Sequence, residues 1–241
     1  MKVHSKNCIP CGIFLEVNPN PYHNLEKKED GVEKRQTGDV VDLNCYWKKM
    51  EKNEKVLFSL ARLNESAGVE FVLKQRCLGA RKDGLSKTLI LDLDETLIYR
   101  RGSKLLIRPF AVELIMELSR VYEIIIFTAS EEAHTLPVIK ELDPLGVITA
   151  AFFRDSCCSS SIPGILIKDL RIFQDRKFTD ICIVDDNILS FAYQTQNGIP
   201  ILPFLGQKHD NELIKLYYFL ISISQFKDLR IPISKTFNLQ V

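Results

Sequence analysis

Carboxylates gather at two points of this 241-residue sequence, and each group directly follows an apolar run. The run TLIL leads into Asp92 and, two residues later, Asp94, and the run ICIV leads into Asp185 and Asp186. If the first run stays extended, Asp92 and Asp94 leave it on the same side. Like charges that are held together repel each other, so such a group needs a cation. Oxygen ligands with room for water suit Mg²⁺, and the four aspartates are therefore candidate metal ligands.

Two further polar groups lie between these carboxylates. Thr128, Ala129 and Ser130 follow the apolar run IIIF, and Lys168 lies in the segment ILIKDL. A threonine hydroxyl and nearby backbone N–H groups can hold phosphate oxygens, and a lysine can neutralise a carboxylate or contact a phosphate. Each cluster alone is more often a helix cap or a surface feature. Together they supply a carboxylate nucleophile, an acid–base group, a metal site and phosphate ligands, which favours phosphoryl transfer.

The elements that must position these residues have the pattern of an α/β fold. The apolar runs are short, continuous and partly β-branched, as in strands that are covered on both faces. Helical patterns fall between and after them, one of them with Pro137 as a kink or break. Strands that alternate with helices predict a parallel sheet, in which ligands bind beyond the carboxyl ends of the strands. The expected strands are 88–91, 124–127, 150–153 and 181–184, and the expected helices are 110–122, 131–142 and 211–224.

Composition gives few hints of a partner. The net charge of +1 gives no bias toward nucleic acid, and no apolar run reaches the ~18 residues of a membrane span. Seven cysteines, two of them adjacent at Cys157 and Cys158, suit a reducing compartment better than a disulfide framework. We expect a cytoplasmic or nuclear protein, and its oligomeric state stays open.

The N-terminal part differs from the rest of the chain. Residues 1–39 are polar and are expected to form a disordered tail. Residues 40–78 have a helical pattern, and a polar linker up to residue 85 follows. The pair Cys8 and Cys11 is a single CxxC motif, for which zinc binding, redox chemistry and an incidental tail feature remain open.

The motifs taken together resemble those of a known superfamily. In chain order, LDLDETL, RPF, IFTAS, FFRDSC, IKDL and VDDN are similar to the motifs of the haloacid dehalogenase (HAD) superfamily. More narrowly, they resemble its C-terminal-domain (CTD) phosphatase branch, with the small CTD phosphatase, Dullard and FCP1-type catalytic domains. The resemblance covers roughly residues 86–226. It implies a Rossmann-like parallel sheet flanked by helices over residues 86–241 and a Mg²⁺-dependent protein serine/threonine phosphatase.

The resemblance implies a role for each matched carboxylate. Asp92 would be the nucleophile that forms an aspartyl-phosphate, and Asp94 the acid for the leaving oxygen and then the base for water. Thr96 would shape the loop that carries Asp94, whose backbone carbonyl would also bind Mg²⁺. Asp185 and Asp186 would complete the metal site.

Substrate contacts are implied in the same way. Thr128 would hold the phosphoryl oxygens with backbone N–H groups nearby, including that of Ala129. Lys168 would neutralise charge between nucleophile and phosphate, and Arg154 would add a substrate or structural contact.

The last motif departs from the usual family pattern, Asp-Asn-Ser-Pro. Here Asp186 replaces the Asn, and Asn187 and Ile188 replace the Ser and Pro. Metal binding is expected to survive this change, with a different Mg²⁺ affinity or preference.

The spacing of the motifs bears on the substrate. Neither the interval from Thr96 to Thr128 nor that from Thr128 to Lys168 has room for a large cap domain, and an open site suits a phosphorylated protein or peptide. Residues 99–108 leave room for a hairpin at most, where the family usually has a longer insert that selects proline-containing phosphopeptides. Specificity for the polymerase II tail is therefore left open.

Three other functions compete with a protein phosphatase. One is a binding protein similar to the mitochondrial import receptor Tim50, with weak or no catalysis. The others are a small-molecule HAD phosphatase and a phosphotransferase.

Basic residues near the first motif are either solvated or form a basic rim that attracts a phosphorylated partner. They are Arg76, Arg81, Lys82, Arg100, Arg101, Lys104 and Arg108.

Overall fold

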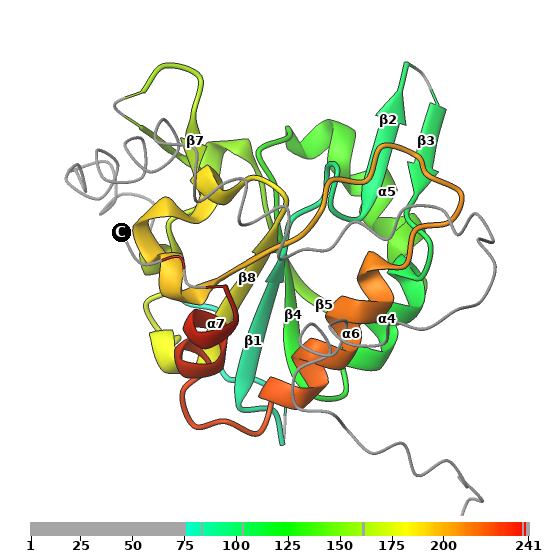
Figure 1. Ribbon diagram of the computed structural model, residues 1–241. Helices are drawn as coiled ribbons and strands as arrows, with labels where there is room; N and C mark the ends of the chain where they lie inside the picture. The colour runs from blue at the N-terminus through cyan, green and yellow to red at the C-terminus, as the bar shows by residue number, and fades with distance from the viewer. Residues whose placement is uncertain (1–75, 83, 103, 161, 238, 240–241) are drawn as a thin grey trace, which may run out of the picture.

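The computed structural model describes residues 76–82, 84–102, 104–160, 162–237 and 239 (Figure 1). The expected tail, most of the expected helical extension and the Cys8–Cys11 motif lie outside the described residues, so these predictions stay predictions. Within the described part, the expectation of helix up to residue 78 is wrong. Arg76 instead forms a parallel bridge with Phe173, and its N–H donates to the Ile172 carbonyl at 2.7 Å.

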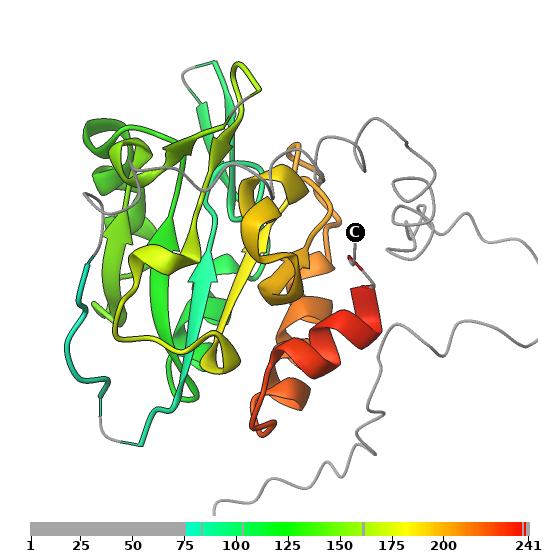
Figure 2. The same cartoon turned by 90° about the vertical axis from the view of Figure 1, so that its left-hand side faces the viewer.

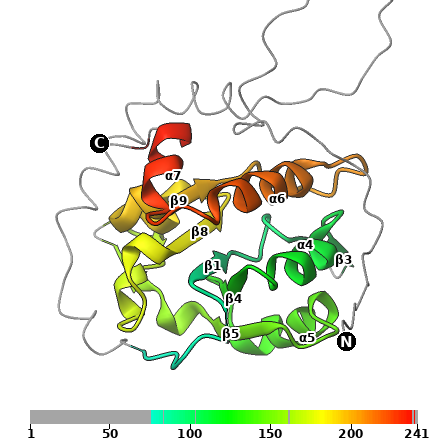
Figure 3. The same cartoon turned by 90° about the horizontal axis from the view of Figure 1, so that it is seen from below.

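A parallel five-stranded sheet forms the centre of the described part (Figures 1 and 3). Its strand order is β5-β4-β1-β8-β9, and every neighbouring pair is parallel. Because β1 lies between β4 and β8, the loops that follow these three strands leave the sheet side by side. The strands are β1 (Lys87–Leu91), β4 (Tyr122–Phe127), β5 (Ile148–Phe152), β8 (Ile181–Asp185) and β9 (Gly198–Pro200).

Burial explains the continuous apolar runs. Every residue of β1, β4 and β8 is buried, because helices or turns cover both faces of the sheet. Figure 3 shows α4 (Ala111–Leu118), α5 (Glu132–Leu142) and α6 (Glu212–Ile223) along one face. The 3₁₀ segment η4 (Ile188–Asn197) and α7 (Arg230–Phe237) cover the other face, where α7 packs against η4 and β9 (Figure 2). The predicted α/β fold is confirmed.

Two small hairpins complete the fold. β2 (Ile98–Arg101) pairs with β3 (Lys104–Ile107) in antiparallel fashion, and this hairpin occupies the interval in which a hairpin was expected (Figure 1). A second pair, β6 (Cys158–Ser159) and β7 (Leu166–Ile167), leads directly into Lys168. None of the described helices is long and apolar enough to cross a membrane.

Some boundaries and elements differ from the expectations. The helix expected over 110–122 ends at Leu118, because the chain turns there to enter β4. Helix α5 continues through Pro137, which has no N–H to donate to the carbonyl of Ala133. Both residues are exposed, so water can bind that carbonyl instead. β9 and α7 were not expected. β9 has three residues, and α7 contains Pro232, so neither has a clear periodicity.

Candidate functional site

Asp92 and Asp94 lie in the loop after the central strand β1. The backbone N–H of Asp92 donates to the Val184 carbonyl at 2.9 Å, which continues the pairing of β1 with β8. The chain then turns sharply: Glu95 has a φ of 62°, and two later N–H groups donate back to the Leu93 carbonyl. The Asp92 side chain is buried at the edge of the sheet, whereas the Asp94 side chain, just before the turn, is 34% exposed.

Lys168 joins the carboxylates that follow β1 and β8. Its ammonium donates to Asp92 Oδ1 and, at 2.6 Å, to Asp185 Oδ2. All three side chains are buried. Two backbone contacts fix this arrangement, because the N–H of Lys168 donates to the Ser190 carbonyl and the N–H of Asn187 donates to Asp185 Oδ1. Burial alone would lower the pKa of Lys168, but the two carboxylates raise it, so the ammonium stays charged.

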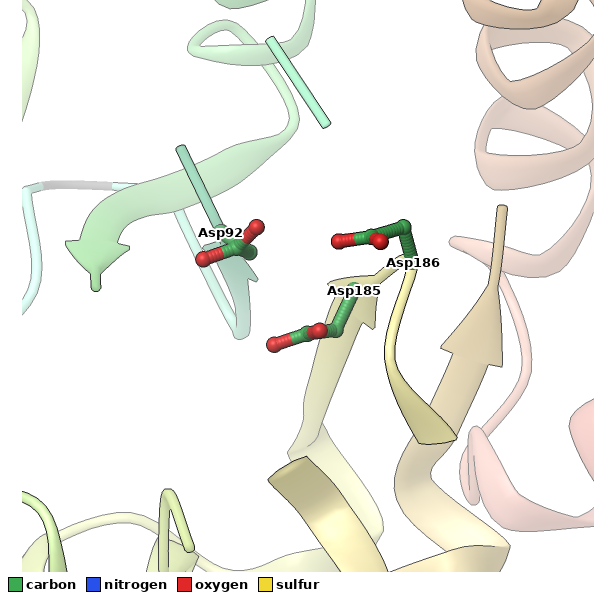
Figure 4. Close-up of side chains that lie close together, drawn as sticks. All are labelled: Asp92, Asp185 and Asp186. Carbon is green, nitrogen blue, oxygen red and sulfur yellow. The ribbon is translucent and has the colours of Figure 1, made fainter. Parts of the chain in front are cut away.

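Three carboxylates form a compact acidic cluster (Figure 4). One oxygen each of Asp92, Asp185 and Asp186 lies within 4.8 Å of the others. Burial raises the pKa of Asp92 to about 7, with Lys168 opposing and Asp185 reinforcing the shift. Burial and the charge of Asp185 also raise the pKa of Asp186 to about 7.

The charge balance of this cluster suits a divalent cation. The lysine neutralises one of the three carboxylates, so two negative charges remain when all three are ionised. Buried charges without a partner are costly, and carboxylate oxygens are the ligands that Mg²⁺ prefers. The donor set therefore fits Mg²⁺, for which Asp92, Asp185 and Asp186 could supply the carboxylate ligands. The Asp94 carboxylate lies outside this group, so only its backbone carbonyl remains a predicted ligand.

The loop after β4 brings the expected phosphate-binding group to the same edge. Thr128 is buried, and its N–H donates to the Phe152 carbonyl at 2.9 Å. Its Oγ1 accepts from the N–H of Ser130 at 3.0 Å and lies 3.4 Å from Asp94 Oδ2. Ser130 Oγ donates to the same Asp94 oxygen at 2.6 Å. The Asp94 carboxylate thus connects the loops after β1 and β4.

Arg154 lies beside this loop rather than among the carboxylates. One of its terminal nitrogens donates to the Ala129 carbonyl at 3.1 Å, and its backbone N–H donates to the Ser130 carbonyl at 3.0 Å. It borders an open hollow of about 360 Å³. The lining residues are Glu131, Glu132, Phe153, Arg154 and Asp155.

Thr96 is buried behind the loop that carries Asp94. Its carbonyl accepts from Arg108 at 3.0 Å, and its Oγ1 has no hydrogen-bond partner within the described part of the chain. Arg108 also forms two hydrogen bonds of 2.8 Å to Asp210 and one of 2.9 Å to the Leu202 carbonyl. The basic-rim hypothesis is therefore wrong for Arg108, whose side chain is fully buried. Among the other basic residues, Arg100 faces the site.

Sequence reasoning missed two residues that contact Asp94. Ser130 was noted in the cluster TAS but was assigned no role, and its position two residues after Thr128 was the signal that could have found it. Arg100 was counted only as one of several basic residues; its Nε lies 3.4 Å from Asp94 Oδ1. Both contacts depend on where the loop after β4 and the β2–β3 hairpin lie, which the apolar pattern does not predict.

Comparison with known proteins agrees with this geometry. The profile of the NLI interacting factor-like phosphatase family matches residues 87–230, more than half of the chain. CTD small phosphatase-like protein 2 of Dictyostelium discoideum is 33% identical over 172 residues, which cover 63% of this chain and 30% of that protein. The mitochondrial import inner membrane translocase subunit TIM50 of Gibberella zeae is 31% identical over 158 residues, which cover 63% of this chain and 29% of that protein.

A solved structure was also found. It is that of a variant of the fission yeast RNA polymerase II CTD phosphatase Fcp1 bound to beryllium fluoride, with a TM-score of 0.41 and 17% identity. The match covers 72% of this chain and 57% of that one. The chain spans between 30% and 55% of the length of the first curated relatives that it matches. On the family match, the chain belongs to the NLI interacting factor-like phosphatases, the FCP1 and small CTD phosphatase branch of the HAD superfamily.

Proposed function

We propose that this chain is a Mg²⁺-dependent phosphomonoester hydrolase that works through an aspartyl-phosphate on Asp92. The observation that carries the proposal is the buried cluster in which Lys168 binds both Asp92 and Asp185 beside a third carboxylate. An ion pair that served only to join two loops would need one carboxylate beside the lysine, whereas three are present. The two surplus negative charges lie on buried or half-buried carboxylates, and a cation and a phosphoryl group would balance them and complete the site.

The residues supply each step of the reaction. An oxygen of Asp92 attacks phosphorus while the bond to the leaving oxygen breaks, and Asp94 gives that oxygen its proton. Water then attacks the phosphorus; Asp94 takes a proton from it, and the bond to Asp92 breaks to release phosphate. Lys168 would balance the charge of Asp92 in both steps, and the Thr128 hydroxyl would bind a phosphoryl oxygen. Bound Mg²⁺ would add positive charge that stabilises the transferring phosphoryl group.

The proposed substrate is phosphoserine or phosphothreonine in a protein or peptide. The short β2–β3 hairpin stands in place of a cap, Asp94 is partly exposed, and the hollow beside Arg154 leaves room for peptide residues next to the phosphorylated one. A small metabolite would be less well enclosed in such a site. The proposal includes a cytoplasmic or nuclear location, on the cysteine content. Turnover of phosphopeptides and sugar phosphates tests the substrate class, and a strong preference for the sugar phosphates would contradict it.

The match to a translocase subunit favours one alternative, a binding protein with weak or no catalysis. Against it stands the complete set of Asp92, Asp94, Thr128, Lys168 and Asp185 at one edge of the sheet. A binding surface has no need for this set, since a buried ion pair contributes little net stability.

Hydrolysis of p-nitrophenyl phosphate tests the reaction. We expect activity between about pH 5 and 7 with Mg²⁺, loss of activity with EDTA, and loss in Asp92→Asn. Glu141→Gln is the matched control, because Glu141 is exposed near the far end of α5. Activity that survives in folded Asp92→Asn would rule out the aspartyl-phosphate. A folded but inactive wild-type protein would favour the binding-protein alternative.

A further inference from the structure

The carboxylate of Asp94 is held at both oxygens. Ser130 Oγ donates to Oδ2 at 2.6 Å, with Thr128 Oγ1 3.4 Å from the same oxygen. On the other side, Arg100 Nε lies 3.4 Å from Oδ1. These donors come from two separate parts of the chain, the loop after β4 and the hairpin strand β2.

Arg100 is itself anchored. While its Nε faces Asp94, its NH2 group donates to the His134 carbonyl of α5 at 3.0 Å. The planar guanidinium thus connects the β2–β3 hairpin, the carboxylate of Asp94 and helix α5. A lysine at this position would keep the charge, but its single ammonium could not hold both acceptors in the same geometry.

Asp94 needs such contacts more than the other catalytic groups do. Asp92 and Lys168 are buried, so the surrounding core limits their side-chain conformations. The Asp94 side chain is 34% exposed and directly precedes the turn that begins at Glu95. Packing alone therefore does not fix its rotamer, and an acid that transfers a proton must lie within hydrogen-bond reach of the leaving oxygen.

We propose that Ser130 and Arg100 are positioning residues that set the direction of the Asp94 carboxyl group toward the leaving oxygen. The inference rests on the proposed function, since it assigns a role in that reaction. It differs from a simpler role of Arg100 as an exposed cation that attracts phosphorylated substrates. It also differs from a role of Ser130 as a ligand of the phosphoryl group.

The leaving group of the substrate separates these roles. p-Nitrophenolate leaves readily and needs little protonation, whereas the serine alkoxide of a phosphopeptide needs a proton from Asp94. Loss of positioning should therefore lower kcat/KM for the phosphopeptide far more than for p-nitrophenyl phosphate. Loss of attraction or of a phosphoryl contact should lower both, because both substrates carry the same phosphate group. The peptide should be neutral apart from that phosphate.

The experiment compares kcat/KM for both substrates in Arg100→Ala, Arg100→Lys and Ser130→Ala, with Arg101→Ala as the matched control. Arg101 is the next residue of β2, is exposed, and forms no ion pair with other described residues. A positioned acid contributes about 10²- to 10⁴-fold, so we expect the two alanine variants to lose about 10- to 100-fold on the phosphopeptide. On p-nitrophenyl phosphate we expect a loss of less than about threefold. Arg100→Lys should regain only part of the phosphopeptide activity.

Several outcomes would overturn the proposal. They are equal losses on both substrates, full recovery in Arg100→Lys, or the same leaving-group effect in Arg101→Ala. Arg100 is partly exposed, so its variants are expected to fold even if Ser130→Ala does not. Asp92→Asn is measured on both substrates beside them. If the wild type is active and Asp92→Asn is not, the proposed function stands whatever the leaving-group result; an inactive wild type would overturn both.

Discussion

Lys168 Nζ lies 2.6 Å from Asp185 Oδ2, and both side chains are buried. Lys168 directly follows the short strand β7, whereas Asp185 ends β8 in the central sheet. The contact therefore fixes an irregular segment against the edge of the sheet that carries the candidate site. Because the same ammonium also binds Asp92, the proposed nucleophile already has a countercharge beside it.

Removal of that ammonium should cost both activity and stability. In Lys168→Met, the buried Asp92 and Asp185 lose their countercharge, and breaking a buried pair typically costs about 3–5 kcal/mol. We expect loss of phosphatase activity and a lower free energy of unfolding in urea. The destabilisation should be greater at about pH 8 than at about pH 5, since protonation removes the repulsion between the carboxylates.

Lys87→Met is the control for this variant. Lys87 is also buried and pairs with Asp180 at 2.8 Å, but it lies at the start of β1, the end opposite to the site. It should lower stability and leave the activity of the folded protein unchanged. Activity in Lys168→Met within a few-fold of the wild type would show that the ammonium has no part in the reaction.

Asp186→Asn should stabilise the protein when no metal is added. Burial and Asp185 raise the pKa of Asp186 to about 7, above its ordinary value of 3.8. Between these two values the folded state binds more protons than the unfolded state, so this group lowers stability as pH rises through that range. Asparagine removes the effect. At about pH 8 in EDTA we expect a higher Tm than for the wild type, with a smaller increase in Tm on addition of Mg²⁺. A lower Tm in EDTA would contradict the assigned charge repulsion.

Mg²⁺ affinity should rise with pH. Burial raises the pKa values of both Asp92 and Asp186 to about 7, and each must lose its proton to bind a cation. We expect calorimetry to give a Kd at least about tenfold weaker at pH 6 than at pH 8, with proton release at the lower pH. A pH-independent Kd would mean that these carboxylates do not bind the metal.

The sequence indicated the carboxylate cluster because its positions follow from topology alone. β1 pairs with β8 from Thr88 and Ile181 onward, so the residues that follow both strands meet at one edge whatever their rotamers. The contacts of Asp94 could not be predicted in this way. They depend on the turn at Glu95 and on the direction of side chains from a hairpin, neither of which has a hydrophobic period.

Arg108 is a second residue whose contacts could not be predicted from the sequence. Arg108 lies in the apolar segment LLIRPF, but a charged side chain at such a position is more often solvated than buried. Its acceptors, Asp210 and the Leu202 carbonyl, lie far along the chain, and its guanidinium lies 5.5 Å from the centre of the Phe204 ring. Non-local partners of this kind are visible only once the sheet has brought the segments together.

Arg108→Lys should therefore lower both the stability of the protein and its activity. The guanidinium holds Asp210 with two hydrogen bonds and the Thr96 carbonyl with a third, and a lysine can keep only part of this set. We expect a loss of about 2–4 kcal/mol in the free energy of unfolding. Because Thr96 lies two residues after Asp94, we also expect a lower kcat in the folded fraction.

Arg120→Lys is the matched control for that variant. Arg120 forms an exposed pair with Glu117 on the protein surface, so the change should cost less than about 0.5 kcal/mol and leave kcat unchanged. If Arg108→Lys lowers stability but the folded protein keeps its full kcat on a phosphoserine peptide, Arg108 supports the fold alone. A fall in kcat that is larger for the phosphoserine peptide than for p-nitrophenyl phosphate would show that it also stabilises the loop from which Asp94 reaches the leaving oxygen.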